Sequence, residues 1–222
     1  MINVINHQLV ADRVGELQAE ILSKSDNPVR IVAVTKGFGV QAVIAANRAG
    51  VDDIGENYAQ EMVAKKEMLA NVNPDSKSRW HFIGNLQRNK VKKISSHVFL
   101  WQSVNSIPLG EEIIKRCKEP QLLIQVNMTG AKNQGGLPPS EAPAFVERLR
   151  GIDVNVLGLM TIGDHGDREA TLKHFQNLRT MANSLDLLEC SMGMSNDYDL
   201  AIEAGATILR LGTAIFGNRD ED

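Results

Sequence analysis

Short aliphatic runs and amphipathic stretches alternate eight times along this 222-residue sequence. Runs such as 31–35 and 122–126 predict buried strands, and the stretches between the runs carry apolar residues at helical spacing. Regular alternation of this kind gives a mostly parallel sheet with helices packed outside it. We therefore predict an α/β fold: a single (β/α)8 TIM barrel domain over residues 1–222, with an extra N-terminal helix at 3–24.

The eight predicted strands are short and evenly spread along the chain. They cover residues 31–35, 53–55, 80–84, 98–101, 122–126, 156–160, 187–190 and 207–211. A loop rich in Gly and Pro, residues 127–140, follows the fifth strand. Loops of that length in a compact domain are usually functional or mobile, and the sequence leaves open whether this loop closes over a site.

Composition excludes several classes of partner. The formal charge of -3 creates no global field for nucleic acid or anionic lipid, so neither is expected. Cys117 and Cys190 form neither a metal-type pair nor a disulfide framework, which suits a reducing compartment. The N-terminal stretch lacks a signal-peptide pattern, and no apolar run approaches the ~18 residues of a membrane span. We expect a cytoplasmic protein without a metal, monomeric, with a dimer as the alternative.

The first predicted strand, 31–35, is followed by Lys36 and Gly37. A parallel strand of this kind delivers the lysine amine to the carboxyl edge of the sheet, where active sites of α/β folds lie. An amine at that edge can attack a carbonyl carbon. We expect Lys36 to hold an aldehyde cofactor as a Schiff base; the alternative is a strand-end lysine that extends into water.

Two segments late in the chain have the features of anion sites. After the seventh strand, a Gly-containing turn leads to Ser195, a good helix N-cap residue, and offers backbone N–H groups. After the eighth strand, Gly212 allows close approach of an anion and Thr213 adds a hydroxyl. Barrels often bind phosphate with these two loops. Arg210 lies close to the same place and could donate to a pyridine nitrogen without giving up its proton.

Other patterns support rival readings. The segment 37–42 fits G-x-G-x-x-A between a strand and a helix, and Glu56 lies at the distance of a ribose-binding carboxylate, so an NAD-binding Rossmann-type oxidoreductase is an alternative. His81 on the third strand is expected to be a hydrogen-bonded core residue. The basic cluster at 88–93 and the pair Lys65-Lys66 are expected to lie on solvated helix faces.

Several of these segments together resemble the pyridoxal phosphate homeostasis proteins (the YggS/PROSC family). The matching segments are Val32–Lys36, Gly55–Glu61, His81–Lys90, Gly158–Met160, Ser191–Ser195 and Arg210–Gly217. The resemblance covers nearly the whole chain. It implies a barrel similar to the N-terminal domain of alanine racemase, with pyridoxal 5'-phosphate bound to the lysine of the first strand.

The resemblance also implies which residues contact the cofactor. The matching motif positions are Lys36, Asn57, Met192, Ser195, Arg210, Gly212 and Thr213. Family members are known as cofactor carriers or regulators without an established catalytic activity. One position departs from the family pattern: Gln134 stands where a lysine is common, and Lys132 lies two residues earlier.

We therefore predict a protein that buffers or delivers pyridoxal 5'-phosphate, with PLP-dependent apo-enzymes as recipients. Racemisation needs two opposed bases, and neither Tyr58 nor Tyr198 can be assigned as the second base from sequence. A weak PLP-dependent amino-acid racemase or lyase is the alternative. Such an enzyme would convert some amino acid at a rate above the background reaction of the free cofactor in solution.

Overall fold

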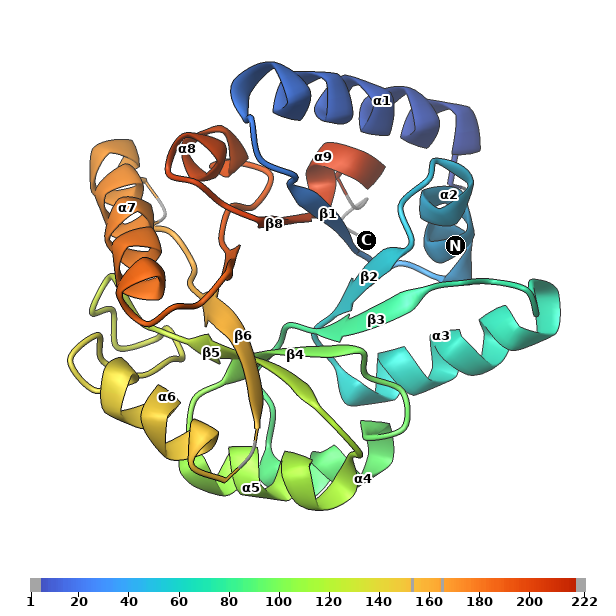
Figure 1. Cartoon of the computed structure of the whole chain (residues 1–222). Helices are drawn as coiled ribbons and strands as arrows, with labels where there is room; N and C mark the ends of the chain where they lie inside the picture. The colour runs from blue at the N-terminus through green and yellow to red at the C-terminus, as the bar shows by residue number, and fades with distance from the viewer. Residues whose placement is uncertain (1–4, 153, 165, 219–222) are drawn as a thin grey trace.

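The computed structural model describes residues 5–152, 154–164 and 166–218. Within these residues, eight parallel strands form a closed barrel in which each strand pairs with the next along the chain and β8 pairs with β1. The helices surround the strands, as Figure 1 shows in a view along the barrel. The (β/α)8 prediction is confirmed, and the closed strand order contradicts the Rossmann alternative, which requires an open, doubly wound sheet.

The bounds of the elements follow the sequence pattern closely. The strands are β1 Arg30–Val34, β2 Asp53–Glu56, β3 Arg79–Phe82, β4 Leu100–Val104, β5 Gln121–Gln125, β6 Asn155–Met160, β7 Glu189–Ser191 and β8 Ile208–Leu211. The helices are α1 His7–Lys24, α2 Val40–Arg48, α3 Ala59–Val72, the 3-10 turn η1 Arg88–Lys90, α4 Val91–Ile94, α5 Ile107–Arg116, α6 Ala142–Arg150, α7 Arg168–Ser184, α8 Tyr198–Glu203 and α9 Thr213–Phe216.

The extra helix α1 covers the junction between β8 and β1, and Figure 1 shows it crossing beside α2, α8 and α9. The side chain of Asn6 caps its N-terminus by accepting a hydrogen bond from the backbone N–H of Leu9. This cap places the start of the helix at His7, later than predicted; residues 3 and 4 lie outside the described residues. Its buried face consists of Val10, Val14, Leu17 and Ile21.

The barrel has two apolar cores. The larger lies between the strands and the surrounding helices, and the smaller fills part of the barrel interior. The interior cluster consists of Val32, Leu100, Leu123, Met160 and Ile208. Among the residues that the structure describes, every helix is too short or too polar to cross a membrane.

The fourth strand is displaced from its predicted position. We predicted residues 98–101, but β4 covers Leu100–Val104. Gln102 and Ser103 look like the end of a strand by their polarity, yet both are buried and hydrogen-bonded inside the fold. The seventh strand is shifted in the same direction, to Glu189–Ser191, and α9 was not predicted.

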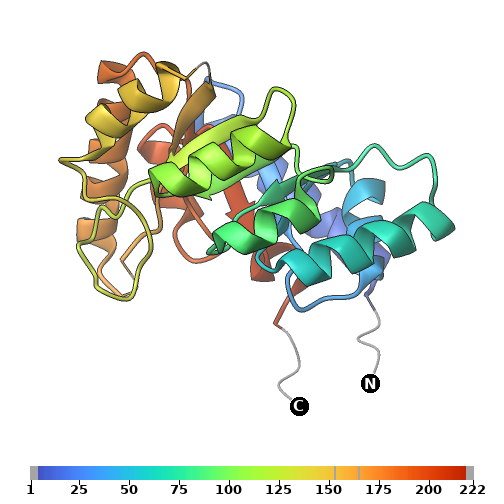
Figure 2. The same cartoon turned by 90° about the horizontal axis from the view of Figure 1, so that it is seen from below.

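The long loop after β5, residues 127–140, packs against the segment that follows β6 and lies beside α7. Figure 2 shows it in yellow-green beside the orange α7. Gln134 organises the loop: its Nε2 donates to the backbone oxygen of Gly163 at 3.1 Å, and its Oε1 accepts from the Thr129 hydroxyl at 2.9 Å. The glutamine that departs from the family pattern therefore ties this loop to the segment that follows β6.

Candidate functional site

A cavity of about 310 Å³ lies at the carboxyl end of the barrel strands. This is the end at which TIM barrels place their active sites. Residues of β1, β6 and β8 line the cavity, together with residues that follow β1, β2, β3, β6, β7 and β8. It brings together six of the seven predicted contact residues, which are Lys36, Asn57, Ser195, Arg210, Gly212 and Thr213.

Lys36 reaches the cavity because it continues the inward-facing side of β1. Val32 belongs to the interior apolar cluster, and a Cβ built on Gly55 of β2 would touch both Val32 and Val34, so the two valines face the barrel interior. Side chains alternate along a strand, which puts Lys36 on the same side. Gly37 follows with φ of 73°, and the turn closes with a hydrogen bond from the Phe38 N–H to the Thr35 oxygen at 3.0 Å.

A buried lysine from α3 supports the turn that carries Lys36. Lys65 Nζ donates to the backbone oxygen of Thr35 at 2.6 Å and to Glu56 Oε1 at 2.6 Å. It also lies 3.1 Å from Glu61 Oε2, which accepts the Gly37 N–H at 3.0 Å. The residues before and after Lys36 are thus both held by this group.

The positions of Lys65 and Glu56 show that two interpretations of the sequence were wrong. Lys65 is buried, with 5% of its surface exposed, and does not lie on a solvated face. Glu56, the ribose carboxylate of the Rossmann alternative, is fully buried against Lys65 and Thr35. Burial raises the pKa of Glu56 even though Lys65 acts to lower it. The spacing of Glu61 and Lys65, four residues apart on a helix, was the available signal for the ion pair.

Asn57 presents an unsatisfied acceptor near Lys36. Its Oδ1 is buried and has no hydrogen-bond partner among the described residues. Its backbone is fixed by Gly84, where a Cβ would lie 2.1 Å from the Asn57 carbonyl oxygen. A buried polar atom without a partner is rare in proteins and is often explained by a bound molecule.

The loops after β7 and β8 meet at Ser195. Its hydroxyl oxygen accepts hydrogen bonds from the backbone N–H groups of Gly212 at 3.3 Å and Ala214 at 3.0 Å. Among the described residues, no hydrogen bond of the loops uses the N–H groups of Ser195, Asn196 and Thr213. This corner of the cavity is therefore rich in donors and suited to an anion.

Arg210 is a buried cation in the wall of the same cavity. Its Nη1 donates to the Ser191 hydroxyl and its Nη2 to the backbone oxygen of Thr161, both at 2.8 Å. Burial lowers the pKa of Arg210 to about 10, against the attraction of Asp197. The guanidinium therefore stays protonated at neutral pH and acts only as a donor.

Met192 and His81 lie in the core. Met192 is fully buried and does not belong to the described lining of the cavity, so its contact with a cofactor stays a prediction. His81 is fully buried and hydrogen-bonded to Asp53 and Gln102, as expected for a core histidine. Within the basic cluster, Arg88, Lys92 and Lys93 are exposed, which agrees with a solvated face.

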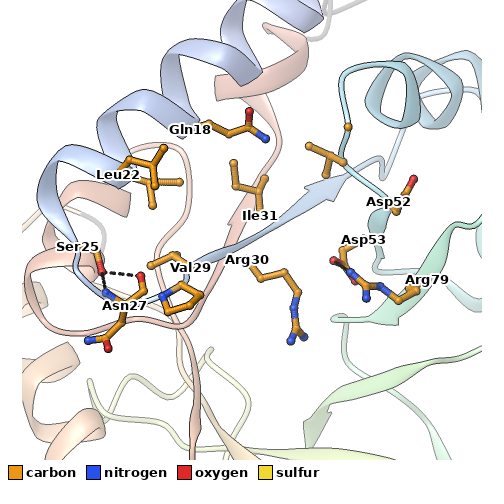
Figure 3. Close-up of a pocket in the computed structure, with 14 residues that line it drawn as sticks. Gln18, Leu22, Ser25, Asn27, Val29, Arg30, Ile31, Asp52, Asp53 and Arg79 are labelled. Carbon is orange, nitrogen blue, oxygen red and sulfur yellow. Dashed lines mark hydrogen bonds and ion pairs between the residues drawn. The ribbon is translucent and has the colours of Figure 1, made fainter.

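A second cavity, of about 400 Å³, lies at the opposite end of the barrel under α1. Figure 3 shows Arg30, Asp53 and Arg79 in its wall, at the starts of the first three strands. None of the predicted contact residues belongs to its described lining. The first cavity is therefore the candidate site.

The comparisons with known proteins show the family of the chain. The family model described as "Alanine racemase, N-terminal domain" matches residues 5–220. A pyridoxal phosphate homeostasis protein of Synechocystis sp. is 38% identical over 213 residues, which cover 90% of this chain and 96% of the relative. The structure of PipY of Synechococcus elongatus with PLP bound has a TM-score of 0.82 at 32% identity and covers 94% of this chain and 100% of PipY.

More distant structures share the fold alone. An alanine racemase of Clostridium difficile has a TM-score of 0.73 at 14% identity, and the match covers 95% of this chain but 61% of the racemase. Family model, relatives and barrel thus agree. The chain belongs to the alanine racemase N-terminal domain family and, within it, to the pyridoxal phosphate homeostasis proteins.

Proposed function

We propose that this protein binds pyridoxal 5'-phosphate through Lys36 and acts in the cytoplasm as a one-domain carrier that buffers or delivers the cofactor. The proposal rests on the residues that line one cavity. An amine, a buried guanidinium and a donor-rich corner all line it. The PLP-bound PipY relative supports the identity of the ligand.

The residues of the cavity fit this cofactor. Lys36 supplies the amine, and Arg210 supplies a donor for the ring nitrogen. The unused N–H groups of Ser195, Asn196 and Thr213 supply donors for the phosphate. The unsatisfied Oδ1 of Asn57 would accept a hydrogen bond from the ring hydroxyl. The volume of about 310 Å³ lies at the lower end of the range for small-molecule sites, ~300–1,000 Å³.

Pyridoxal 5'-phosphate supplies an aldehyde that joins reversibly to a primary amine, so capture and release need only amine exchange. The residues of the chain orient this chemistry. Lys65 and Glu61 hold the backbone on either side of Lys36. Arg210 keeps its own proton and so leaves a bound ring nitrogen unprotonated, which weakens electron withdrawal by the cofactor.

The positions of the two tyrosines favour a carrier over a racemase. The hydroxyl of Tyr198 donates to Glu20 of α1 at 2.8 Å, and Tyr58 is 61% exposed beside a different surface pocket. Neither belongs to the described lining of the candidate site. A second base opposite Lys36 is therefore not supplied by a tyrosine of this cavity.

The proposal is tested with the absorption spectrum of the purified protein after incubation with pyridoxal 5'-phosphate. We expect a Schiff-base band that borohydride removes, with the label on the peptide containing Lys36. Lys36→Ala should lose the band, and Lys92→Ala, on the exposed face of α4, should keep it. A retained band in Lys36→Ala would remove Lys36 from its role. An absent band in the wild type would refute cofactor binding.

Delivery and assembly need separate measurements. Loaded protein should activate a PLP-dependent apo-enzyme, and Lys36→Ala should not. Loaded protein should show no amino-acid turnover above that of the cofactor in solution; turnover would favour the racemase or lyase alternative. Light scattering on a sizing column should give the mass of a monomer.

A further inference from the structure

Five buried polar side chains form a continuous row through the barrel interior. They come from five strands, β2, β3, β4, β7 and β8, and each is at most 5% exposed. We call them the interior chain: Asp53, His81, Gln102, Ser191 and Arg210. Arg210, at one end, lines the candidate site.

One hydrogen bond joins each pair of consecutive residues in the interior chain. Arg210 Nη1 and Ser191 Oγ are 2.8 Å apart, and Ser191 Oγ and Gln102 Oε1 are 2.6 Å apart. Gln102 Nε2 lies 2.8 Å from His81 Nδ1, and His81 Nε2 lies 2.8 Å from Asp53 Oδ1. The row therefore has no gap between the guanidinium and the carboxylate.

The chemistry of the ends fixes the direction of every bond. A guanidinium can only donate, so Ser191 accepts from Arg210 and gives its own proton to the Gln102 carbonyl. The Gln102 amide then donates to Nδ1 of His81. Because Nδ1 accepts from the amide, the proton of the ring lies on Nε2, facing Asp53. Burial lowers the pKa of His81 and so favours this neutral form. The opposite orientation of the Gln102 amide would move that proton to Nδ1 and set a lone pair against the carboxylate.

The Asp53 end opens into the second cavity. Figure 3 shows Asp53 beside Arg79, and Arg79 Nε donates to Asp53 Oδ1 at 2.8 Å. Burial would raise the pKa of Asp53, but the hydrogen bonds from His81 and Arg79 outweigh it and hold the pKa below the ordinary value. Asp53 is therefore a carboxylate at neutral pH. The interior chain connects this charge to the candidate site at the other end of the barrel.

We propose that Asp53 anchors the interior chain and, through the three residues between them, holds the Arg210 guanidinium toward the candidate site. Hydrogen bonds that point the same way polarise one another, by roughly 10–30% per bond. His81, Gln102 and Asp53 are then positioning residues for Arg210. The role toward a pyridine nitrogen rests on the proposed function; the order of Arg210 does not.

The test uses nitrogen NMR of the ligand-free protein with labelled histidine and arginine. We expect the His81 proton on Nε2 and slow rotation of the Arg210 guanidinium, seen as separate Nη signals. Gln102→Leu should speed this rotation about tenfold. Ser191 loses its acceptor in this variant, which weakens the hydrogen bond between Ser191 and the charged guanidinium of Arg210. Gln125→Leu is the matched control. It makes the same change at a buried glutamine on β5 that bonds to Gly135 instead.

A milder variant protects the test against misfolding. Asp53→Asn keeps an acceptor for His81 but removes the charge, and it should shift the Arg210 signals from the far end of the barrel. A proton on Nδ1 of His81 would overturn the proposal, as would Arg210 signals that match the wild type in both Gln102→Leu and Asp53→Asn.

The cofactor provides an independent readout. Gln102→Leu should lower the affinity for pyridoxal 5'-phosphate on the order of tenfold, and Gln125→Leu should leave it unchanged. Unchanged affinity in Gln102→Leu would overturn the role of the interior chain toward the ligand. A wild type that shows the NMR signature but never binds the cofactor would refute the proposed function and leave the order of Arg210 intact.

Discussion

Lys65 Nζ lies 2.6 Å from the backbone oxygen of Thr35, the residue that precedes Lys36. A lysine on α3 thus fixes the end of β1 without entering the candidate site itself. The same nitrogen neutralises Glu56, whose carboxylate is fully buried. One buried cation therefore serves both the stability of the barrel and the placement of the Lys36 amine.

Replacing Lys65 should be costly. Lys65→Met leaves Glu56 buried and without its cation, and removal of one partner of a buried ion pair costs about 3–5 kcal/mol in the free energy of unfolding. The measurement is urea denaturation. Lys66→Met, at the half-buried neighbouring position, should cost less than about 1 kcal/mol.

A double variant separates the charge effect from packing. Lys65→Met with Glu56→Gln should recover part of the lost stability because no unpaired charge remains. Equal midpoints for Lys65→Met and Lys66→Met would contradict the assigned role of Lys65.

Ser195 should discriminate between cofactor forms with and without phosphate. Ser195→Ala removes the hydroxyl at the meeting point of the Gly212 and Ala214 N–H groups. Affinity for pyridoxal 5'-phosphate should fall about tenfold, while affinity for pyridoxal should stay the same. Ser184→Ala, at the exposed end of α7, is the control. An equal loss for both ligands would place the effect outside the phosphate corner.

The two cysteines should differ in reactivity. Burial raises the pKa of Cys190 to about 11, and burial also raises the pKa of the half-buried Cys117. A raised pKa means less thiolate at a given pH and slower alkylation. At pH 8, mass spectrometry should find iodoacetamide on Cys117 first and on Cys190 only after unfolding. Modification of Cys190 at the same rate as Cys117 would contradict its burial.

Cys190 should also shape stability at high pH. In the unfolded chain its thiol ionises near the ordinary value of 9.0, whereas in the fold it ionises near 11. The unfolded state therefore releases the proton first, and stability present below pH 9 should be lost as the pH rises toward 11. Denaturation midpoints of Cys190→Ala should fall less over this range than those of the wild type. A parallel decline would contradict the shift.

Two glycines should respond in opposite directions to alanine. Gly84→Ala would place a Cβ 2.1 Å from the Asn57 carbonyl oxygen, so the backbone of Asn57 must move and both stability and cofactor affinity should drop. Gly15 lies within α1 with nothing within 4 Å of a built Cβ. Gly15→Ala should therefore stabilise the protein by about 0.5–1 kcal/mol in thermal or urea unfolding. Tolerance of Gly84→Ala would contradict the close approach.

The barrel and most of its candidate site were predictable because both follow from position along the strands. Alternation identified the fold, and strand ends placed Lys36, Arg210 and Gly212 at one edge. Asn57 and Ser195 followed from the same rule. These residues need only the correct order of elements, which hydrophobic patterning supplies.

The support behind the site was not predictable from patterning. Gln102 is a polar residue inside a strand. In a hydrophobic pattern such a residue indicates either the end of the strand or a position that faces solvent. Only the three-dimensional neighbours, His81 and Ser191, explain its burial. The spacing of Glu61 and Lys65 indicated an ion pair, but the burial of Lys65 depends on Glu56, which lies on another element. Polar residues inside a fold depend on partners far away in the chain.

The junction of β8 with β1 under α1 has a consequence for biosynthesis. Arg13 of α1 donates to the Ile215 oxygen of α9 at 3.3 Å, and β1 pairs along its length with β8. The helix α1 packs on α2 but also on α8 and α9, so part of its apolar face is covered only after the C-terminal part of the barrel has been synthesised. Until then this part of the face is exposed to chaperones, and a nascent chain that lacks β8 has an open ring of strands in which β1 has no β8 partner.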